Sequence, residues 1–211
     1  FNPVTETITS SIRQSGSFIV VENRVDFADV QNLSGEMQRA IRTLASQGIV
    51  SGASPTHFAP DQTVTRAQIA AMYTRMLGIY DPNSTVNFED VQRGDWFSGS
   101  VGTAYRHRLM TGTSPTHFSP NMNTPRDQLT AISARVLRNR MRYRDPADPM
   151  ALLRTEFNDY EQLAGWSITD IALATRENLV IPRADGNFAP TGTMTRGEAA
   201  LMLYRLYLRL W

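Results

Sequence analysis

The sequence predicts an all-α fold made of three helix-loop-helix repeats. The loop SPTHFAP at residues 54–60 returns almost unchanged as SPTHFSP at residues 114–120. A phenylalanine followed eight residues later by an arginine occurs three times, as Phe58 with Arg66, Phe118 with Arg126 and Phe188 with Arg196. Units of this length cannot bury their apolar faces alone, so we expect the three repeats to pack into one structure.

The first helix of each repeat is marked by an opening motif and by apolar periodicity. The motifs are FADV from Phe27, FEDV from Phe88 and FNDY from Phe157. In the first repeat, apolar residues recur at the spacing of one face of an α-helix. They are Met37, Ala40, Ile41 and Leu44. Gly48 follows at a position suited to the left-handed conformation that ends a helix.

The second helix of each repeat follows the loop and shows the same apolar spacing. The residues are Ile69, Met72, Tyr73, Met76 and Leu77, then Leu129, Ile132, Val136 and Leu137, then Ala199, Met202, Leu203 and Leu206. Three equivalent amphipathic helices predict a shared helical bundle.

Capping signals predict where these second helices begin. Two of them open with capping boxes, Thr65 with Gln68 and Thr195 with Glu198. In the second repeat, Thr124 precedes Pro125 and Asp127, which predicts a helix with proline at its first position, shifted by one residue.

The repeats divide the chain into five segments. They are an N-terminal segment or linker at 1–24, the first repeat at 25–80, the second at 81–142, a linker at 143–154 and the third repeat at 155–211. The linker is indicated by two Asp-Pro pairs, which favour turns. Because the chain starts at Phe1 without a methionine or a signal-like leader, we expect a mature or excised piece of a longer protein.

Composition argues against several classes of protein. The 211 residues carry a net charge of +1, so wholesale binding to nucleic acid is not expected. All 21 basic residues are arginine, whose planar guanidinium recognises carboxylates and phosphates. The absence of cysteine rules out a disulfide scaffold. No apolar stretch approaches the roughly 20 residues that cross a bilayer, so no transmembrane segment is expected.

A catalytic centre is not expected either. His57 and His117 occupy the same loop position in two repeats, where the third has Asn187, and catalytic sets are rarely duplicated in register. His107 has no nucleophile at a recognisable spacing. Histidine-rich metal spacings, calcium loops and phosphate-binding glycine loops are all missing from the sequence, so no metal or cofactor is expected.

Arg66, Arg126 and Arg196 are expected at the N-termini of the second helices, where a cation faces the positive end of the macrodipole at a cost of roughly 0.3–1 kcal/mol. Two explanations are open. An external carboxylate or phosphate lies between the guanidinium and the free N–H groups of the first turn, or each arginine pairs with a carboxylate of the fold itself. The aligned carboxylates are Asp29, Asp90 and Asp159.

Two further columns recur in register. Arg75, Arg135 and Arg205 lie nine residues beyond the first arginines, where their charge complements the helix C-terminus, so we expect a structural role. Trp96 and Trp166 align at the start of the first helix. Each indole is either a core residue or a stacking surface for a sugar ring.

These motifs in order resemble the S-layer homology domain family. The family pattern has an F-x-D-V opening, a Trp-led helix, a GI-x-x-G turn, an F-x-P loop and a T-R-A-E helix start. The chain matches it with FADV…GIVSG…FAPDQTVTRAQ, with FEDV…W…LMTG…FSPNMNTPRDQ and with FNDY…W…FAPTGTMTRGE. The resemblance covers about residues 25–211 as three tandem copies.

The resemblance implies a pseudo-threefold spindle around a central three-helix bundle, with grooves between neighbouring repeats. It implies a binding module of a secreted protein at the cell wall or S-layer surface, attached non-covalently through a secondary cell wall polysaccharide that carries a pyruvate ketal. The arginine of T-R-A-E contacts this carboxylate in the family. The expected site residues are therefore Arg66, Arg126, Arg196, Gly52, Gly112, Trp96, Trp166, Asp29 and Asp90.

Several residues depart from the family pattern. Pro182 stands where a glycine could adopt positive φ, so the third loop is expected to follow another path. Glu36 replaces the tryptophan in the first repeat, Pro125 replaces the threonine before the arginine, and Arg108 replaces the first turn glycine. We therefore expect fewer than three working grooves.

Two rival functions stay open. The fold could serve as a protein-interaction or surface-lattice module beside a neighbouring S-layer or cargo domain. The arginine-rich stretch 135–144 is then a contact surface, a binding surface for wall phosphates or simply a solvated helix end. The same fold could instead bind peptidoglycan.

Overall fold

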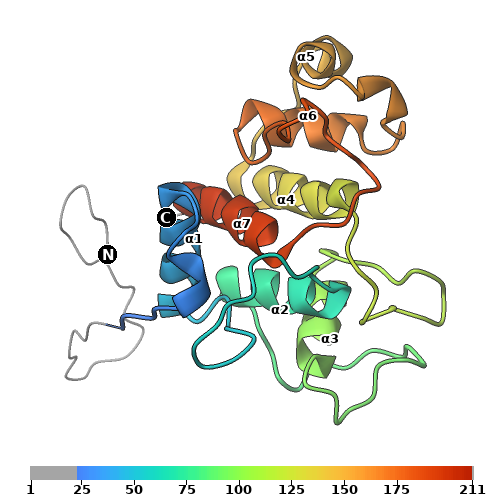
Figure 1. The fold of residues 1–211 in the computed structure, drawn as a ribbon. Helices are drawn as coiled ribbons and strands as arrows, with labels where there is room; N and C mark the ends of the chain where they lie inside the picture. Colours follow the sequence, from blue (N-terminus) through green and yellow to red (C-terminus); the bar gives the residue numbers. More distant parts are fainter. Residues whose placement is uncertain (1–22, 211) are drawn as a thin grey trace, which may run out of the picture.

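A computed structural model of the chain describes residues 23–210 and shows a helical molecule (Figure 1). The α-helices of this range are α1 (Gly35–Ser46), α2 (Arg66–Met76), α3 (Ser98–Arg106), α4 (Arg126–Met141), α5 (Pro149–Glu156), α6 (Ile168–Arg176) and α7 (Arg196–Leu210). Two short 3-10 helices, η1 (Ala28–Val30) and η2 (Tyr160–Gln162), overlap the opening motifs of the first and third repeats. The all-α prediction is confirmed. Among the described helices, none is both long and apolar enough to cross a membrane.

The repeats exchange helix partners. The second helix α2 packs on α3, α4 packs on α6, and α7 packs on α1, so each second helix contacts the first helix of another repeat. Figure 1 shows α1 and α7 side by side although they come from opposite ends of the described chain. The third repeat is thereby joined back to the first. A threefold spindle requires this cyclic order, and its overall symmetry stays a prediction.

A closed ring of backbone hydrogen bonds joins the segments before the second helices. The N–H of Val64 donates to the carbonyl of Met194 at 3.0 Å, that of Thr124 to Val64 at 3.0 Å, and that of Met194 to Thr124 at 3.2 Å. All three residues are buried. Because a buried backbone group needs a partner, the ring satisfies each repeat only when the other two are in place.

The opening phenylalanines pack on the loop phenylalanines of their own repeats. The ring centroids lie 5.7 Å apart for Phe27 and Phe58, 5.8 Å for Phe88 and Phe118, and 5.3 Å for Phe157 and Phe188. The loop rings are completely buried. This explains why the two motifs recur together: each aromatic pair anchors a loop to the opening motif of its own repeat.

The second helices also meet one another. The hydroxyl of Tyr73 on α2 lies 2.5 Å from Ser133 Oγ on α4, and Ser133 Oγ contacts Met202 Sδ on α7 at 3.3 Å. Complete burial raises the pKa of Tyr73 far above its ordinary value. These contacts confirm that residues of all three second helices share one core.

The capping predictions are confirmed at two helices and wrong at one. Thr65 and Gln68 form the expected reciprocal pair at α2, and the same two hydrogen bonds join Thr195 and Glu198 at α7. At α4, Pro125 is the N-cap rather than the first helical residue, and it lacks a capping side chain. The helices therefore start in register at the arginines. Gly48 has φ +69°, as its position after α1 predicts.

The segment between the second and third repeats is partly helical. The expected linker at 143–154 runs into α5, which is capped by the Asp148 side chain at 3.0 Å from the N–H of Ala151 and packs on α6. The other repeat boundaries stay predictions. Residues 1–22 of the N-terminal segment lie outside the described residues.

Candidate functional site

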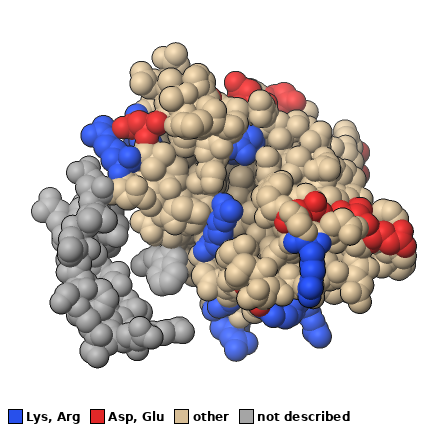
Figure 2. All heavy atoms as spheres, turned by 90° about the horizontal axis from the view of Figure 1, so that it is seen from below, with Lys and Arg blue, Asp and Glu red and all other residues tan. Residues whose placement is uncertain are grey.

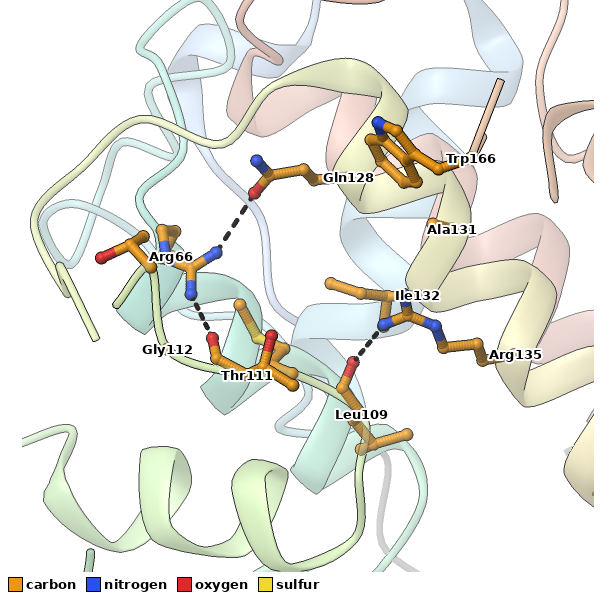
Figure 3. A pocket seen from close by; sticks show the side chains of 11 residues that line it. Arg66, Leu109, Thr111, Gly112, Gln128, Ala131, Ile132, Arg135 and Trp166 are labelled. Carbon is orange, nitrogen blue, oxygen red and sulfur yellow. Dashed lines mark hydrogen bonds between the residues drawn. The ribbon is translucent and has the colours of Figure 1, made fainter. Parts of the chain in front are cut away.

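Two grooves lie at equivalent places along α4 and α7. The first, groove A, is a cavity of about 410 Å³ lined by Arg66, the loop 109–113, Gln128, Ala131, Ile132, Arg135 and Trp166 (Figure 3). The second, groove B, is a cavity of about 190 Å³ lined by Arg126, the loop 179–183, Met194, Glu198, Leu201, Met202 and Arg205. In both, the second helix of one repeat faces the arginine that starts the second helix of the preceding repeat.

Arg66 reaches from the start of α2 into the second repeat. Its Nε donates to the carbonyl of Phe118 at 2.9 Å, and its Nη2 donates to the carbonyl of Thr111 at 2.6 Å. Its Nη1 donates to Gln128 Oε1 at 3.2 Å, and the guanidinium lies 4.6 Å from the Phe118 ring centroid. Carbonyl dipoles of the next repeat therefore offset the unfavourable position of the charge.

The other two arginines follow the same rule less completely. Arg196 donates to the carbonyls of Phe58 at 3.0 Å and Ser51 at 2.7 Å. Arg126 donates to the carbonyl of Ile181 at 2.7 Å, but its Nε is buried without a partner. Burial lowers the pKa of all three guanidinium groups, which still stay charged at neutral pH.

The first-turn N–H groups are also occupied. The N–H of Arg66 donates to the carbonyl of Met122 at 3.0 Å and that of Ala67 to Pro120 at 2.9 Å. An anion between these amides and the guanidinium, one of the two geometries considered from the sequence, has no free amides of the first turn to bind. Arg66 retains two of its five N–H donors, because three are used by the protein.

The aligned aspartates form no ion pair with these arginines, and of the three arginines Arg126 alone has an internal carboxylate partner, which is Glu198 and not an aspartate. Asp90 accepts hydrogen bonds from the N–H groups of Phe118 at 2.8 Å and Ser119 at 2.7 Å. Asp29 and Asp159 do the same in their own repeats. Burial alone would raise the pKa of Asp29, but the backbone hydrogen bonds outweigh it and leave that pKa lowered. These aspartates hold in place the loop that follows the groove-lining turn in each repeat.

Gly52 and Gly112 are required for space and not for positive φ, which corrects the reason offered from the sequence. A Cβ on Gly112 would lie 2.5 Å from the carbonyl oxygen of Ser114 and 2.7 Å from the Phe88 ring. Neither glycine has positive φ. The third loop, with Pro182 at this position, still closes with the hydrogen bond from Arg183 N–H to the Asn187 carbonyl, which corresponds to Thr113 and His117.

The two tryptophans are exposed, so neither is a core residue. Trp166 is 55% exposed and Trp96 is 61% exposed. Trp166 belongs to the third repeat, yet Figure 3 shows it beside α4 at the edge of groove A, because α6 packs on α4. Sequence reasoning missed that placement, and it also missed Gln128 as a groove residue. Gln128 could have been found from the sequence, because it occupies the same repeat position as Glu198.

Groove B contains its own carboxylates. Glu198 Oε1 lies 3.1 Å from Arg183 Nη2 and 3.5 Å from Arg126 Nη1. Glu36 on α1 accepts two hydrogen bonds of 2.8 Å from Arg205, and this contact lowers the pKa of Glu36. Each arginine lining groove B is therefore close to an internal carboxylate.

Groove A is basic by contrast, since its lining includes Arg66 and Arg135 and neither aspartate nor glutamate. The basic character is local. Figure 2 shows a face of the molecule on which arginines and acidic residues are interspersed among uncharged side chains. The arrangement suits a small anionic ligand with an apolar ring face better than an extended polyanion.

Comparison with known proteins identifies the repeats. The S-layer homology domain model matches residues 26–70, 87–130 and 156–200. The amylopullulanase of Thermoanaerobacterium thermosulfurigenes is 30% identical over 200 residues, which cover 95% of this chain and 10% of that protein. Exoglucanase XynX of Acetivibrio thermocellus is 30% identical over 89% of this chain and 17% of its own length.

A third relative is the surface-layer 125 kDa protein of Lysinibacillus sphaericus, which is 23% identical over 90% of this chain and 16% of that protein. The chain thus spans only a small part of each of these relatives, and the enzymes share no more than that part with it. Three matches in tandem cover more than half of the chain. The chain belongs to the S-layer homology domain family.

Proposed function

We propose that this chain anchors a secreted bacterial protein to the cell wall by binding an anionic, pyruvylated secondary wall polysaccharide in groove A. One observation carries the proposal: of the two grooves, A has arginines without a carboxylate partner, beside an exposed indole. The carboxylate of a pyruvate ketal would accept hydrogen bonds from the free donors of Arg66.

The remaining groove residues have separate roles in this proposal. A sugar ring stacks its apolar face on Trp166, whose indole is available because it is exposed. Gly112 allows the loop to fold closely against Ser114 and Phe88, and Asp90 holds that loop.

The relatives support attachment over catalysis. Two enzymes and a surface-layer protein, which differ in what they are named for, share this segment. A shared binding module explains this better than a shared active site does. We therefore place the chain at the cell surface, with its cargo supplied by the rest of a longer protein.

The other predicted site residues have different roles in this proposal. Arg196, Gly52 and Trp96 are the corresponding set between the third and first repeats, and we propose them as a weaker second site. Arg126 contributes little to ligand binding, because Glu198 already lies beside it. Asp29 supports the loop of the weaker site as Asp90 does in groove A.

The test places a carboxylate in groove A. Gln128→Glu copies Glu198 of groove B beside Arg66, and we expect at least tenfold weaker binding to purified walls at an unchanged melting temperature. The control Gln68→Glu makes the same change at the equivalent position of α2, outside groove A, and should weaken binding less. Equal losses from both variants would argue against groove A as the principal site.

Treatment of the walls separates the rival functions. Binding should survive protease digestion and disappear after the polysaccharide is extracted. Loss on protease digestion would favour a protein partner. Undiminished binding to walls stripped of pyruvate would favour a peptidoglycan-type ligand.

A further inference from the structure

Groove A contains a second arginine, Arg135, whose charge is not used when one ketal carboxylate binds at Arg66. Arg135 lies seven residues beyond Gln128 on α4. Seven residues of α-helix rise about 10.5 Å, and Gln128 is the residue that Arg66 contacts. The two guanidinium groups therefore contact different parts of the groove: Arg66 lies against Thr111 and Gln128, and Arg135 lies against Leu109 (Figure 3).

Arg135 is poorly satisfied by the protein. Its Nη1 donates to the carbonyl of Leu109 at 3.3 Å. The side chain is half-buried, and no carboxylate of the described residues lies within ion-pair distance of it. A charge held in a groove with one long hydrogen bond has capacity for an additional anionic partner.

Groove B shows what this position accepts. Arg205 occupies the register of Arg135, and Glu36 binds it through two hydrogen bonds of 2.8 Å. At the other end, Arg126 occupies the register of Arg66 and has Glu198 beside it. In the equivalent groove, each of these two arginines therefore has a carboxylate partner from the protein.

We infer that groove A binds a glycan segment with two carboxylates on successive sugar residues: the first beside Arg66 and the second, from an acidic sugar, beside Arg135. This inference rests on the proposed carbohydrate ligand and specifies its charge pattern. Trp166 lies at the edge of the same groove, where it can contact a ring held between the two charges. The glutamates of groove B show that arginines in these two registers accept carboxylate partners.

The experiment is a calorimetric titration of the full chain with three synthetic disaccharides. The first probe carries a pyruvate ketal and a neutral second ring, the second carries the same ketal and a uronic acid as the second ring, and the third is neutral. We expect the dianionic probe to bind about tenfold more tightly than the monoanionic one, because it gains a charge-assisted contact.

Substitution of Arg135 assigns that difference to one residue. Arg135→Gln should bind both anionic probes equally, at the affinity of wild type for the monoanionic probe. Arg135→Lys should recover part of the preference, since it keeps the charge without the planar fork. Arg75→Gln, the equivalent change on α2, is the matched control and should keep the tenfold preference. Melting temperatures show whether each variant is folded.

The outcomes separate this inference from the proposed function. Equal affinity of wild type for both anionic probes would overturn the second carboxylate site while leaving the ketal site intact. A tenfold preference that persists in folded Arg135→Gln would also overturn it. If neither anionic probe binds wild type better than the neutral disaccharide does, the proposed function fails and the inference fails with it.

Discussion

Groove A and groove B have the same backbone register and the same pair of arginines, but differ at the positions that decide whether a ligand can enter. Gln128 in groove A corresponds to Glu198 in groove B, and Trp166 corresponds to Glu36. The cavity is about 410 Å³ in A and about 190 Å³ in B. The fold therefore survives while one groove fills with its own carboxylates.

The residues that support the grooves from behind are shared by the repeats. Each copy has the arginine that contacts the next repeat, and the loop phenylalanine and the aspartate that hold its own loop. These residues are the same in each copy because they are buried or hold buried groups. Surface positions are free of that constraint, so a repeat can lose its binding groove and keep its structural role.

The largest expected effect comes from removing Arg66 or Arg126, the arginines that join one repeat to the next. Arg66→Ala leaves the carbonyls of Phe118 and Thr111 without a charged donor and should lower the free energy of unfolding by roughly 3 kcal/mol. Arg126→Ala should cost less, because its Nε is already unpaired. Urea denaturation measures both. If Arg126→Ala lost as much free energy of unfolding as Arg66→Ala or more, the two arginines would not differ in the way described.

The next effect tests whether groove B can be opened. In the Gln128→Glu background, which closes groove A, we add Glu198→Gln and Glu36→Trp to give groove B the side chains of groove A. Binding of a pyruvylated disaccharide should rise about tenfold over Gln128→Glu alone, since Arg126 and Arg205 lose their internal partners. Unchanged binding in a folded variant would mean that Arg183 and Pro182 are enough to close groove B.

A smaller effect compares the turns after α3 and α6. Arg108 has φ +56° and Asn178 has φ +54°, at the positions that correspond to Gly48. Arg108→Gly should stabilise the fold by about 1 kcal/mol, whereas Asn178→Gly should gain less, because asparagine tolerates the left-handed region. Thermal denaturation of the two variants gives the difference, and a larger gain at Asn178 would contradict it.

The smallest effect is the pH dependence of the pair between Glu36 and Arg205. The pKa of Glu36 is lowered in the folded state, so its contribution is fully present above the ordinary pKa of 4.5 and is lost as the pH falls through the lowered value. The stability difference between wild type and Glu36→Gln should therefore shrink below pH 4.5. It should be small even at neutral pH, since the Glu36 side chain is 41% exposed. A difference that grows on acidification would contradict the assigned pair.

Much of the local structure was predictable from the sequence. The apolar spacing located α1, α2, α4 and α7, and the Thr65 and Thr195 motifs located two of their starts, because these signals depend on neighbouring residues. At α4 the proline led to a predicted helix start that was wrong by one residue. Backbone hydrogen bonds to the third repeat hold Arg126 and Asp127 in the register of the other helices.

The partners of the arginines were not predictable in the same way. Arg66 binds carbonyls of Phe118 and Thr111, which are 52 and 45 residues away in the next repeat. A repeat pattern aligns equivalent residues, but it does not show which copy contacts which. For the same reason Trp166 was found in the sequence, while its place at the groove between the first and second repeats required the packing of α6 on α4.

A crystal structure of the chain with a pyruvylated wall disaccharide tests the asymmetry of the two grooves most directly. We expect a ligand carboxylate within hydrogen-bond distance of Arg66 in groove A, with Glu198 and Glu36 still beside their arginines in groove B. A ligand bound in groove B while groove A is empty would contradict it.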